Sequence, residues 1–252
     1  MKILRTLPIA IAIALTGCSS SSSNTVDAQG LNKIRATAIT EAAVSYGAQY
    51  ALAWRASTIQ NSIDLHSDTL DSIYNFNSLV MDQNVMPPII QKSDNSMNIT
   101  NPNVIRLSDS VIEIIMPARF VTTPPTWHEY INLTIYKYPE EPSETVLPQN
   151  DEEKALWDKA VKKGWIEGKE QGDQIFIDSL NKLTRDFNGM SLYRQLYEQK
   201  MITAPFVSKA NLGITGNTAK MRLNDKIVRI TKPSELNPNN AKSWKPALIP
   251  SN

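Results

Sequence analysis

The 252-residue sequence has little of the chemistry on which many catalytic and metal centres depend. It contains one cysteine, Cys18, and two histidines, His66 and His128. A single cysteine excludes an intrachain disulfide, so packing has to hold the fold. No His or Cys cluster has the spacing of a metal site, and the only expected cofactor is a covalent lipid. His66 falls within an apolar helical spacing and is interpreted as a packing residue, with a ligand or proton relay as the alternative. A surface or interface role is expected for His128.

The motifs that indicate phosphate binding or nucleophilic catalysis are also missing. Gly168-Lys169 is followed by Glu170, where a P-loop requires Ser or Thr. There is no Gly-x-Ser-x-Gly nucleophile elbow. The adjacent carboxylates at 140–141 and 152–153 are interpreted as solvated charges, because neighbouring residues on a helix do not face each other. The sequence offers no convergent polar site, so we do not expect an enzyme.

A short apolar segment at the N-terminus predicts export. Lys2 and Arg5 precede the apolar residues 8–15, which are too few to span a bilayer. Leu15-Thr16-Gly17-Cys18 matches a lipobox, with cleavage between Gly17 and Cys18 and acylation of Cys18. Ser19 follows the cysteine in place of Asp, which favours the periplasmic side of the outer membrane. The alternative is an ordinary signal peptide followed by a free cysteine.

The composition divides the chain into four parts. Residues 1–17 form the predicted signal peptide, 18–30 the lipidated cysteine and a Ser-rich tether, 31–233 a single domain, and 234–252 an extended tail. Cleavage would remove Lys2 and Arg5, which leaves 24 of the 26 basic residues against 25 acidic ones. This near-neutral balance gives no electrostatic argument for nucleic-acid binding.

Apolar periodicity predicts two long helices, at about 27–74 and 151–199. Small residues recur every four positions on both helices, and three glycines in one row suggest a close approach of another backbone. We therefore predict that the two rows pack on each other; the alternative is that the glycines permit a kink. The rows consist of Ala43, Gly47 and Ala51 on the first helix and Gly164, Gly168 and Gly172 on the second.

Short segments rich in β-branched and aromatic residues predict strands at 104–107, 111–116, 119–121 and 131–136. A hairpin is expected at 221–230, with its turn at 224–226. The resulting fold class is α+β, with two long helices packed with a small mainly antiparallel sheet and extended loops.

A proline-aromatic segment stands out between the strands and the second helix. Two adjacent prolines stiffen the chain, and the aromatic residues around them are of the type enriched at interfaces. The predicted interface residues are Phe120, Pro124, Pro125, Trp127 and Tyr130. The alternative is that these aromatic side chains belong to the core.

Several segments together resemble the DotC lipoprotein family, whose members include the TraI lipoproteins of IncI-type conjugative plasmids. They are residues 46–55, 74–77, 118–127, 157–168, 183–187 and 211–213. The resemblance implies a structural part of a type IVB secretion or conjugation apparatus, in its outer-membrane core. It also implies a DotD-like lipoprotein and a DotH-like component as partners in a multi-copy ring. No catalytic residue carries over, and the lipid attachment falls on Cys18.

Two other functions are alternatives to this expectation. A lipid-anchored cell-wall hydrolase would need a catalytic site that the sequence does not supply. A solute-binding lipoprotein would show repeated βαβ units around a cleft, which two long helices flanking short strands do not match.

Overall fold

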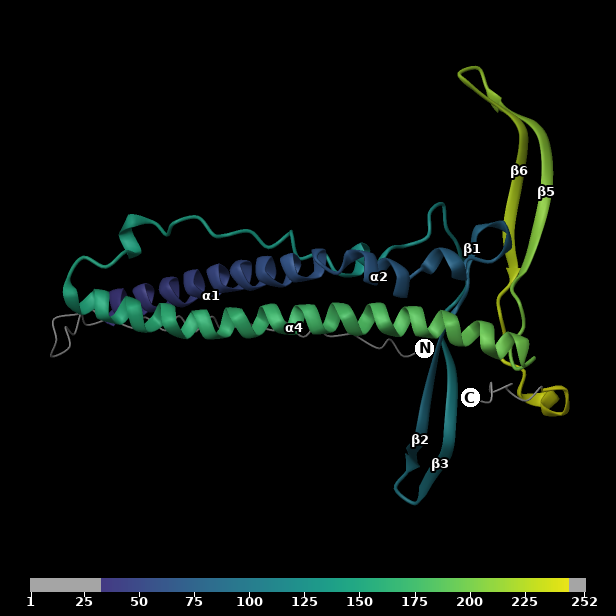
Figure 1. Ribbon diagram of the computed structural model, residues 1–252, viewed down its shortest axis with the longest axis horizontal. Coiled ribbons are helices and arrows are strands. Elements are labelled where there is room, and N and C mark those ends of the chain that lie inside the picture. The colour runs from purple at the N-terminus through teal and green to yellow at the C-terminus, as the bar shows by residue number, and fades with distance from the viewer. Residues whose placement is uncertain (1–32, 245–252) are drawn as a thin grey trace, which may run out of the picture.

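The computed structural model describes residues 33–244 (Figure 1). The predicted signal peptide, Cys18 and the serine-rich tether lie outside the described residues. The α+β class is confirmed. In chain order the elements are α1 (Lys33–Asp64), α2 (Ser67–Ile73), η1 (Phe76–Leu79), η2 (Asp82–Asn84), β1 (Val85–Met86), β2 (Ile89–Asn101), β3 (Val104–Met116), β4 (Arg119–Phe120), α3 (Trp127–Tyr130), η3 (Glu144–Val146), α4 (Asp151–Glu198), β5 (Phe206–Asn217), β6 (Lys220–Lys232) and η4 (Pro238–Ser243).

Helix α4 forms the long axis of the molecule. Its 48 residues extend for about 72 Å at the usual rise per residue. The Asn150 side chain caps its start by accepting a hydrogen bond of 2.9 Å from the backbone N–H of Glu153. The helix continues past Gly189, where a Cβ atom would overlap Ile90 O. This glycine lets the base of β2 contact the backbone of α4 without interrupting the helix.

Helices α1 and α4 touch backbone to backbone through their small residues. A Cβ atom on Gly47 would lie 2.5 Å from Val161 O. Cβ atoms on Gly164 and Gly168 would overlap the backbone of α1, at Val44 and Ala48 respectively. Alanine and larger residues therefore cannot occupy these positions without separating the helices. Gly172 differs, because it faces the side chain of Arg55.

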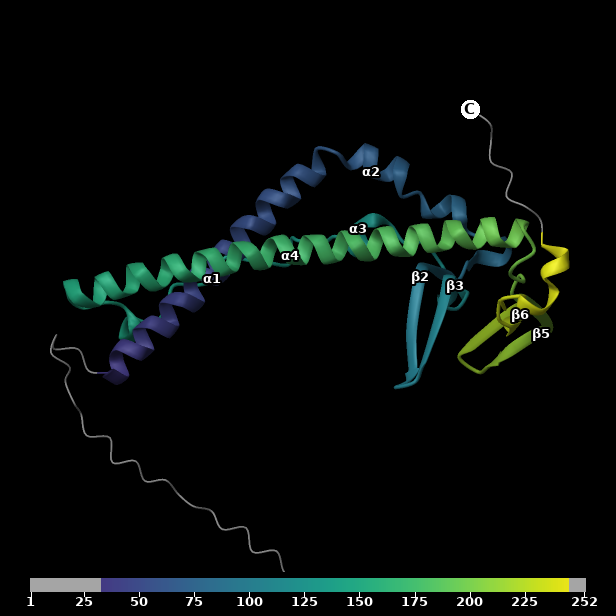
Figure 2. The same cartoon turned by 90° about the horizontal axis from the view of Figure 1, so that it is seen from below.

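The remaining small residues of the α1 row are part of the same contact, since Ala43 and Ala51 are fully buried. Aromatic side chains flank it on one side. Tyr50 packs on Tyr138 with ring centroids 4.8 Å apart, and Trp54 packs on Trp165 at 5.6 Å. Figure 2 shows that α1 crosses α4 obliquely and then diverges from it.

The wedge between the diverging helices holds the larger hydrophobic cluster. Its buried members come from α1, the β1 and β2 region, the segment around α3, and α4: Ala56, Ile59, Ile63, Phe76, Leu79, Met86, Ile89, Trp127, Ile131, Leu133, Leu183 and Met190. A smaller cluster near the end of α4 contains Ile90, Tyr193, Leu196 and Ile202. The core therefore lies beyond the crossing point, towards the C-terminal half of α4.

An ion pair fastens the start of α1 to the start of α4. Arg35 Nε donates to Glu153 Oε1 at 2.6 Å and Arg35 Nη2 donates to Glu153 Oε2 at 2.8 Å. The N–H of Gln149 donates to the same carboxylate at 2.8 Å. The Arg35 hydrogen bonds, with that from Gln149, lower the pKa of Glu153. A second pair, Arg55 with Asp173 at 2.6 Å, joins the helices farther along.

The prediction of one helix over 27–74 is wrong at Leu65 and His66, where α1 ends and α2 begins. His66 is exposed and lies within 2.8 Å of Ser62 O through Nδ1, so it is not a packing residue in the apolar seam. The bend follows the local hydrogen bonding, because the N–H of His66 donates to Ile63 O, three residues back, at 2.9 Å. It brings Tyr74 back, where its hydroxyl lies 3.0 Å from Thr184 Oγ1.

The strands differ from the prediction in extent and arrangement. Residues 104–107 and 111–116 belong to one strand, β3, which pairs with the unpredicted β2. Residues 131–136 form no strand, because Ile131 and Leu133 are buried in an irregular segment that covers the core. In place of one small sheet, the described residues form three separate two-stranded antiparallel sheets, β1–β4, β2–β3 and β5–β6.

The hairpin predicted at 221–230 is wrong, because both of its strands belong to the single strand β6. The C-terminal hairpin of the structure pairs β6 with the unpredicted β5, and its turn lies at 218–219. Asn224, with φ of 55°, and Asp225 lie within β6, at a register shift opposite Gly213. The segment after 233 is not wholly extended. Leu236 bridges to Ile202, and η4 follows it.

The helix crossing predicts a large effect of Gly168→Leu. The new side chain has to displace the backbone of α1, so we expect a loss of about 3 kcal/mol and a fall in Tm of about 6–12 °C. Thermal unfolding followed by circular dichroism measures the effect. Lys169→Leu, at the neighbouring exposed position, is the matched control and should change Tm little. An unchanged Tm for Gly168→Leu would refute the backbone contact.

The Arg35–Glu153 pair predicts a pH dependence of stability. Because the pKa of Glu153 is lowered from 4.5 in the folded chain, its contribution is present above that pH and is lost as the pH falls through the folded value. The free energy of unfolding of the wild type should thus fall more steeply below pH 4.5 than that of Glu153→Gln. Urea denaturation at several pH values measures both slopes. Glu152→Gln should keep the wild-type slope; equal slopes for all three proteins would contradict the prediction.

Candidate assembly surfaces

Two β-hairpins project from the C-terminal half of α4 (Figure 1). We call them the β2–β3 arm (residues 89–116) and the β5–β6 arm (residues 206–232). They leave α4 in different directions in Figure 1, but both extend to the same side of it in Figure 2. Within residues 33–244 each arm pairs with no third strand, so its outer backbone edges are open to pairing.

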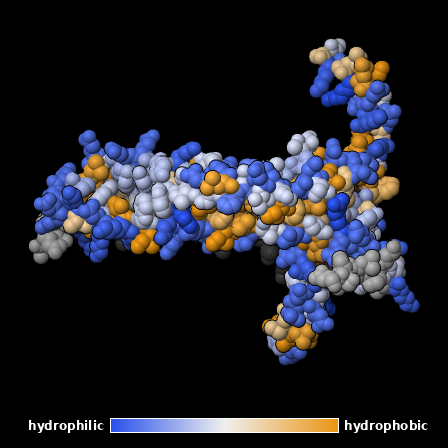
Figure 3. Space-filling view, viewed as in Figure 1, coloured by the Kyte–Doolittle hydropathy of each residue, from blue (hydrophilic) through white to orange (hydrophobic). Residues whose placement is uncertain are grey.

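The outer half of the β2–β3 arm has one apolar face. Met97 pairs with Leu107 and Ile99 pairs with Ile105, so all four side chains share a face. Each of them is more than half exposed. The opposite face carries polar side chains, such as those of the Asn98 and Arg106 pair. Figure 3 shows the resulting hydrophobic patch at the end of this arm.

The β5–β6 arm combines exposed apolar residues with positive charge. Ile214, Met221 and Leu223 are each more than half exposed. Met221 and Leu223 are two residues apart on β6 and therefore share a face. Gly216 lies opposite Met221 with φ of 153°, and a Cβ atom there would overlap the backbone of Lys220. Six of the seven charged residues in the arm are basic.

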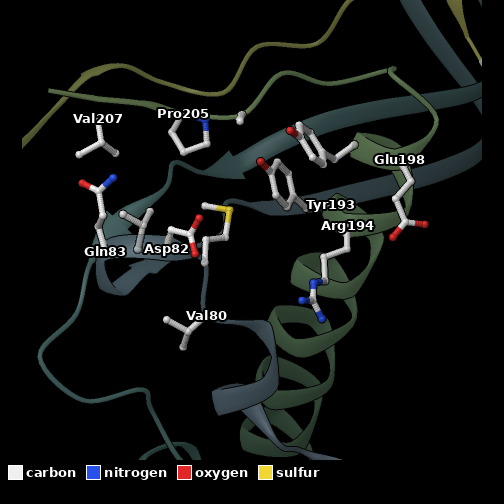
Figure 4. A pocket seen from close by; sticks show the side chains of 12 residues that line it. Val80, Asp82, Gln83, Tyr193, Arg194, Glu198, Pro205 and Val207 are labelled. Atoms are coloured by element: carbon white, nitrogen blue, oxygen red, sulfur yellow. The ribbon is translucent and has the colours of Figure 1, made fainter.

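A cavity of about 560 Å³ lies where the β5–β6 arm joins the body (Figure 4). Its wall comes from η2, the last turns of α4 and the base of β5, and includes Asp82, Gln83, Tyr193, Arg194 and Val207. Tyr193 is 2% exposed, and burial raises the pKa of its hydroxyl. Gln83 has φ of 64°, in the left-handed region. The cavity places charged and apolar side chains together at the root of the arm.

The proline-aromatic segment is only partly at the surface. Trp127 is 1% exposed, and its Nε1–H donates to Asp71 Oδ1 at 2.7 Å. The interface prediction is therefore wrong for Trp127, which is a core residue with a satisfied donor. Pro124 and Pro125 are half-buried, and Phe120 is 40% exposed. Phe120 thus remains the most accessible of the predicted interface residues.

Tyr130 is also tied to the body. Its ring stacks on Phe76 with centroids 5.6 Å apart, and its hydroxyl donates to Asp186 Oδ2 at 3.2 Å. Burial and the neighbouring Asp186 carboxylate raise the pKa of Tyr130 to about 12. The buried Asp186 receives a second bond of 2.7 Å from Arg185 Nη2. This network positions α3 on α4, which is a structural role.

Residues 33–246 match a family described as type IV secretory system, conjugal DNA-protein transfer. The chain belongs to this family. The match covers all of the described residues and agrees with the resemblance to the DotC and TraI lipoproteins. The chain is therefore a component of a type IV secretion or conjugative transfer apparatus and takes part in its complex. No curated protein matches the chain.

Two further findings concern the described part of this family member. No helix within residues 33–244 is both long and apolar enough to cross a membrane. No group of three or more His, Cys, Asp or Glu residues in the same range could hold a metal ion.

The sequence patterns predicted the helix contact, but they missed β2 and β5, the first strand of each arm. A signal for the β2–β3 arm was present, because Met97-x-Ile99 and Ile105-x-Leu107 alternate on either side of Asn101-Pro102-Asn103. Alternation of this kind predicts a strand with one apolar face. It does not show that the face lacks a partner within the chain.

The different environments of Trp127 and Phe120 predict opposite outcomes for their alanine variants. Trp127→Ala removes a buried ring and should cost about 3–5 kcal/mol of stability. Phe120→Ala removes a partly exposed ring and should cost less than about 1 kcal/mol. Chemical denaturation measures both values. Equal losses would show that the two rings are not in the environments described.

Proposed function

We propose that this chain is a non-enzymatic, lipid-anchored structural component of the outer-membrane core of a type IV conjugative apparatus. The family match supports the apparatus. The exposed arms support the structural role. The anchor at Cys18 is inferred from the lipobox, and it would place the protein on the periplasmic side of the outer membrane.

The observation that carries this proposal is the pair of unpartnered arms. A strand edge with exposed apolar residues is a site for pairing with another chain, and soluble monomers usually cover or charge such edges. Here the strands of both arms are 12 or 13 residues long, and both arms bear large apolar side chains on their outer halves. Arms of this kind fit an assembly in which neighbouring proteins cover them.

The helices supply the rest of the scaffold. The crossing of α1 and α4 is fixed by backbone contact and two ion pairs. This contact keeps the arms at a set position relative to the start of α1. We propose that a DotD-like lipoprotein and a DotH-like ring component are the partners, and that the chain helps to hold the ring component at the outer membrane.

One experiment tests both the anchor and the arms. Full-length protein is recovered from detergent extracts of donor cells, and its co-purifying secretion components and the transfer frequency are measured. Cys18→Ser should move the protein out of the membrane fraction and abolish transfer, because the lipid is lost. Met97→Ser with Leu107→Ser should keep the protein at the membrane but lower recovery of the partners about tenfold.

The matched control changes the opposite face of the same arm, with Asn98→Ser and Arg106→Ser. These substitutions should leave recovery of the partners near the wild-type level. The proposal fails if Cys18→Ser remains at the membrane with normal transfer. It also fails if both faces of the arm tolerate substitution equally, or if a soluble form of the protein cleaves peptidoglycan.

A further inference from the structure

The charges of the chain are separated along its length, although the total is nearly balanced. Residues 139–153 contain six carboxylates and no Lys or Arg. The β5–β6 arm contains six Lys or Arg and one Asp. The first segment leads into the start of α4 and the arm follows its end, so the two lie at opposite ends of the molecule (Figure 1).

The positive charge of the β5–β6 arm is available to a partner. Lys232 pairs with Glu235 at 3.1 Å, but the other five basic residues have no ion pair within the described residues. All five are exposed: Lys209, Lys220, Arg222, Lys226 and Arg229. Because Ile214, Met221 and Leu223 are exposed on the same arm, its partner should offer carboxylates together with some apolar surface.

The acidic segment (residues 139–153) offers free carboxylates next to an exposed aromatic ring. Hydrogen bonds from Arg35 hold its backbone in place. Only Glu153 is used internally, in its pair with Arg35. The other five carboxylates are exposed and form no ion pair within residues 33–244: Glu140, Glu141, Glu144, Asp151 and Glu152. Arg35 also donates to the backbone carbonyls of Thr145 and Leu147, at 3.0 and 3.2 Å. Tyr138, which is half exposed, adds apolar surface at its edge.

We propose that the β5–β6 arm of one copy docks on residues 139–152 of a second copy of the same chain. The inference rests on the proposed function, which places many copies on one membrane. The contact joins two different surfaces, so each copy has both an acceptor end and a donor end. Contacts of this head-to-tail type close into rings when the rotation between copies allows it.

The composition of the arm favours a protein partner over the two other anionic partners. Phe206, at the base of the arm, is its one aromatic side chain, whereas proteins that bind single-stranded nucleic acid stack successive bases on several aromatic rings. The turn of the arm is Asn217-Thr218-Ala219, and inserting this polar turn into a bilayer would strip it of water. Docking on an acidic protein surface satisfies the arm's charges and also covers its apolar residues.

Crosslinking in intact membranes tests the contact. The full chain carries Ser143→Cys and Thr218→Cys, and a short thiol-specific crosslinker is applied to donor cells. A head-to-tail contact should give a ladder of dimers, trimers and larger species, because each copy links to two others. Either single variant should give no ladder. The matched control pairs Ser143→Cys with Ser96→Cys on the β2–β3 arm, and it should also give no ladder.

Charge reversal in the same background tests the basis of recognition. Lys220→Glu with Arg222→Glu should reduce the crosslinked yield about tenfold, and Glu140→Lys with Glu141→Lys should do the same. All four substitutions together restore opposite charges and should return most of the yield. Restoration of this kind is not expected if the substitutions merely unfold the arm.

The outcomes separate this inference from the proposed function. An absent ladder with normal membrane location and partner recovery overturns the inference alone. A dimer from Thr218→Cys alone, or a ladder that charge reversal does not change, also overturns it. Purified protein is finally tested with phosphatidylglycerol vesicles and single-stranded DNA. Tight binding to either, lost with Lys220→Glu and Arg222→Glu, would assign the arm to that partner.

Discussion

The backbone contact between α1 and α4 is the constraint on which the rest of the structure depends. Glycine at 47, 164 and 168 brings carbonyl groups of one helix to the Cα atoms of the other. At this distance the helices cannot run side by side with large residues between them, so they cross obliquely and diverge. The divergence creates the wedge that the core fills. A larger residue at the crossing would alter both the angle and the volume of that wedge.

The position of the arms follows from the same use of small residues. Gly189 lets the base of β2 reach the backbone of α4, with Ile89 and Ile90 buried on either side of that contact. The strand pair then leaves the body with its direction already set. The β5–β6 arm leaves from the end of α4 in the same region, next to the smaller cluster. Both arms are thus held at one end of a long helix, and the acidic segment lies at the other.

The sequence predicted the features that local periodicity determines. It missed the features that depend on contacts between segments far apart in the chain. The α4 boundaries and the rows of small residues could be read from spacing, because both follow from the 3.6-residue period. The break at His66 could not, since no proline or glycine marks it in the sequence. Ile131 and Leu133 alternate like a strand but are buried as an irregular segment. Trp127 is of a residue type enriched at interfaces. Only its burial and its hydrogen bond to Asp71 show that it belongs to the core.

The charge of the β5–β6 arm has two consequences that act in the same direction. Two copies of an arm with a large excess of basic residues repel each other, so edge-to-edge pairing of identical arms is disfavoured before assembly. The same charges attract a surface of opposite sign, and they do so over a distance comparable with the Debye length of about 8 Å at physiological salt. Apolar contacts contribute only after this approach. A chain with open strand edges can therefore remain unassociated with the wrong surface and still bind the right one, because charge selects the partner and apolar burial stabilises the contact.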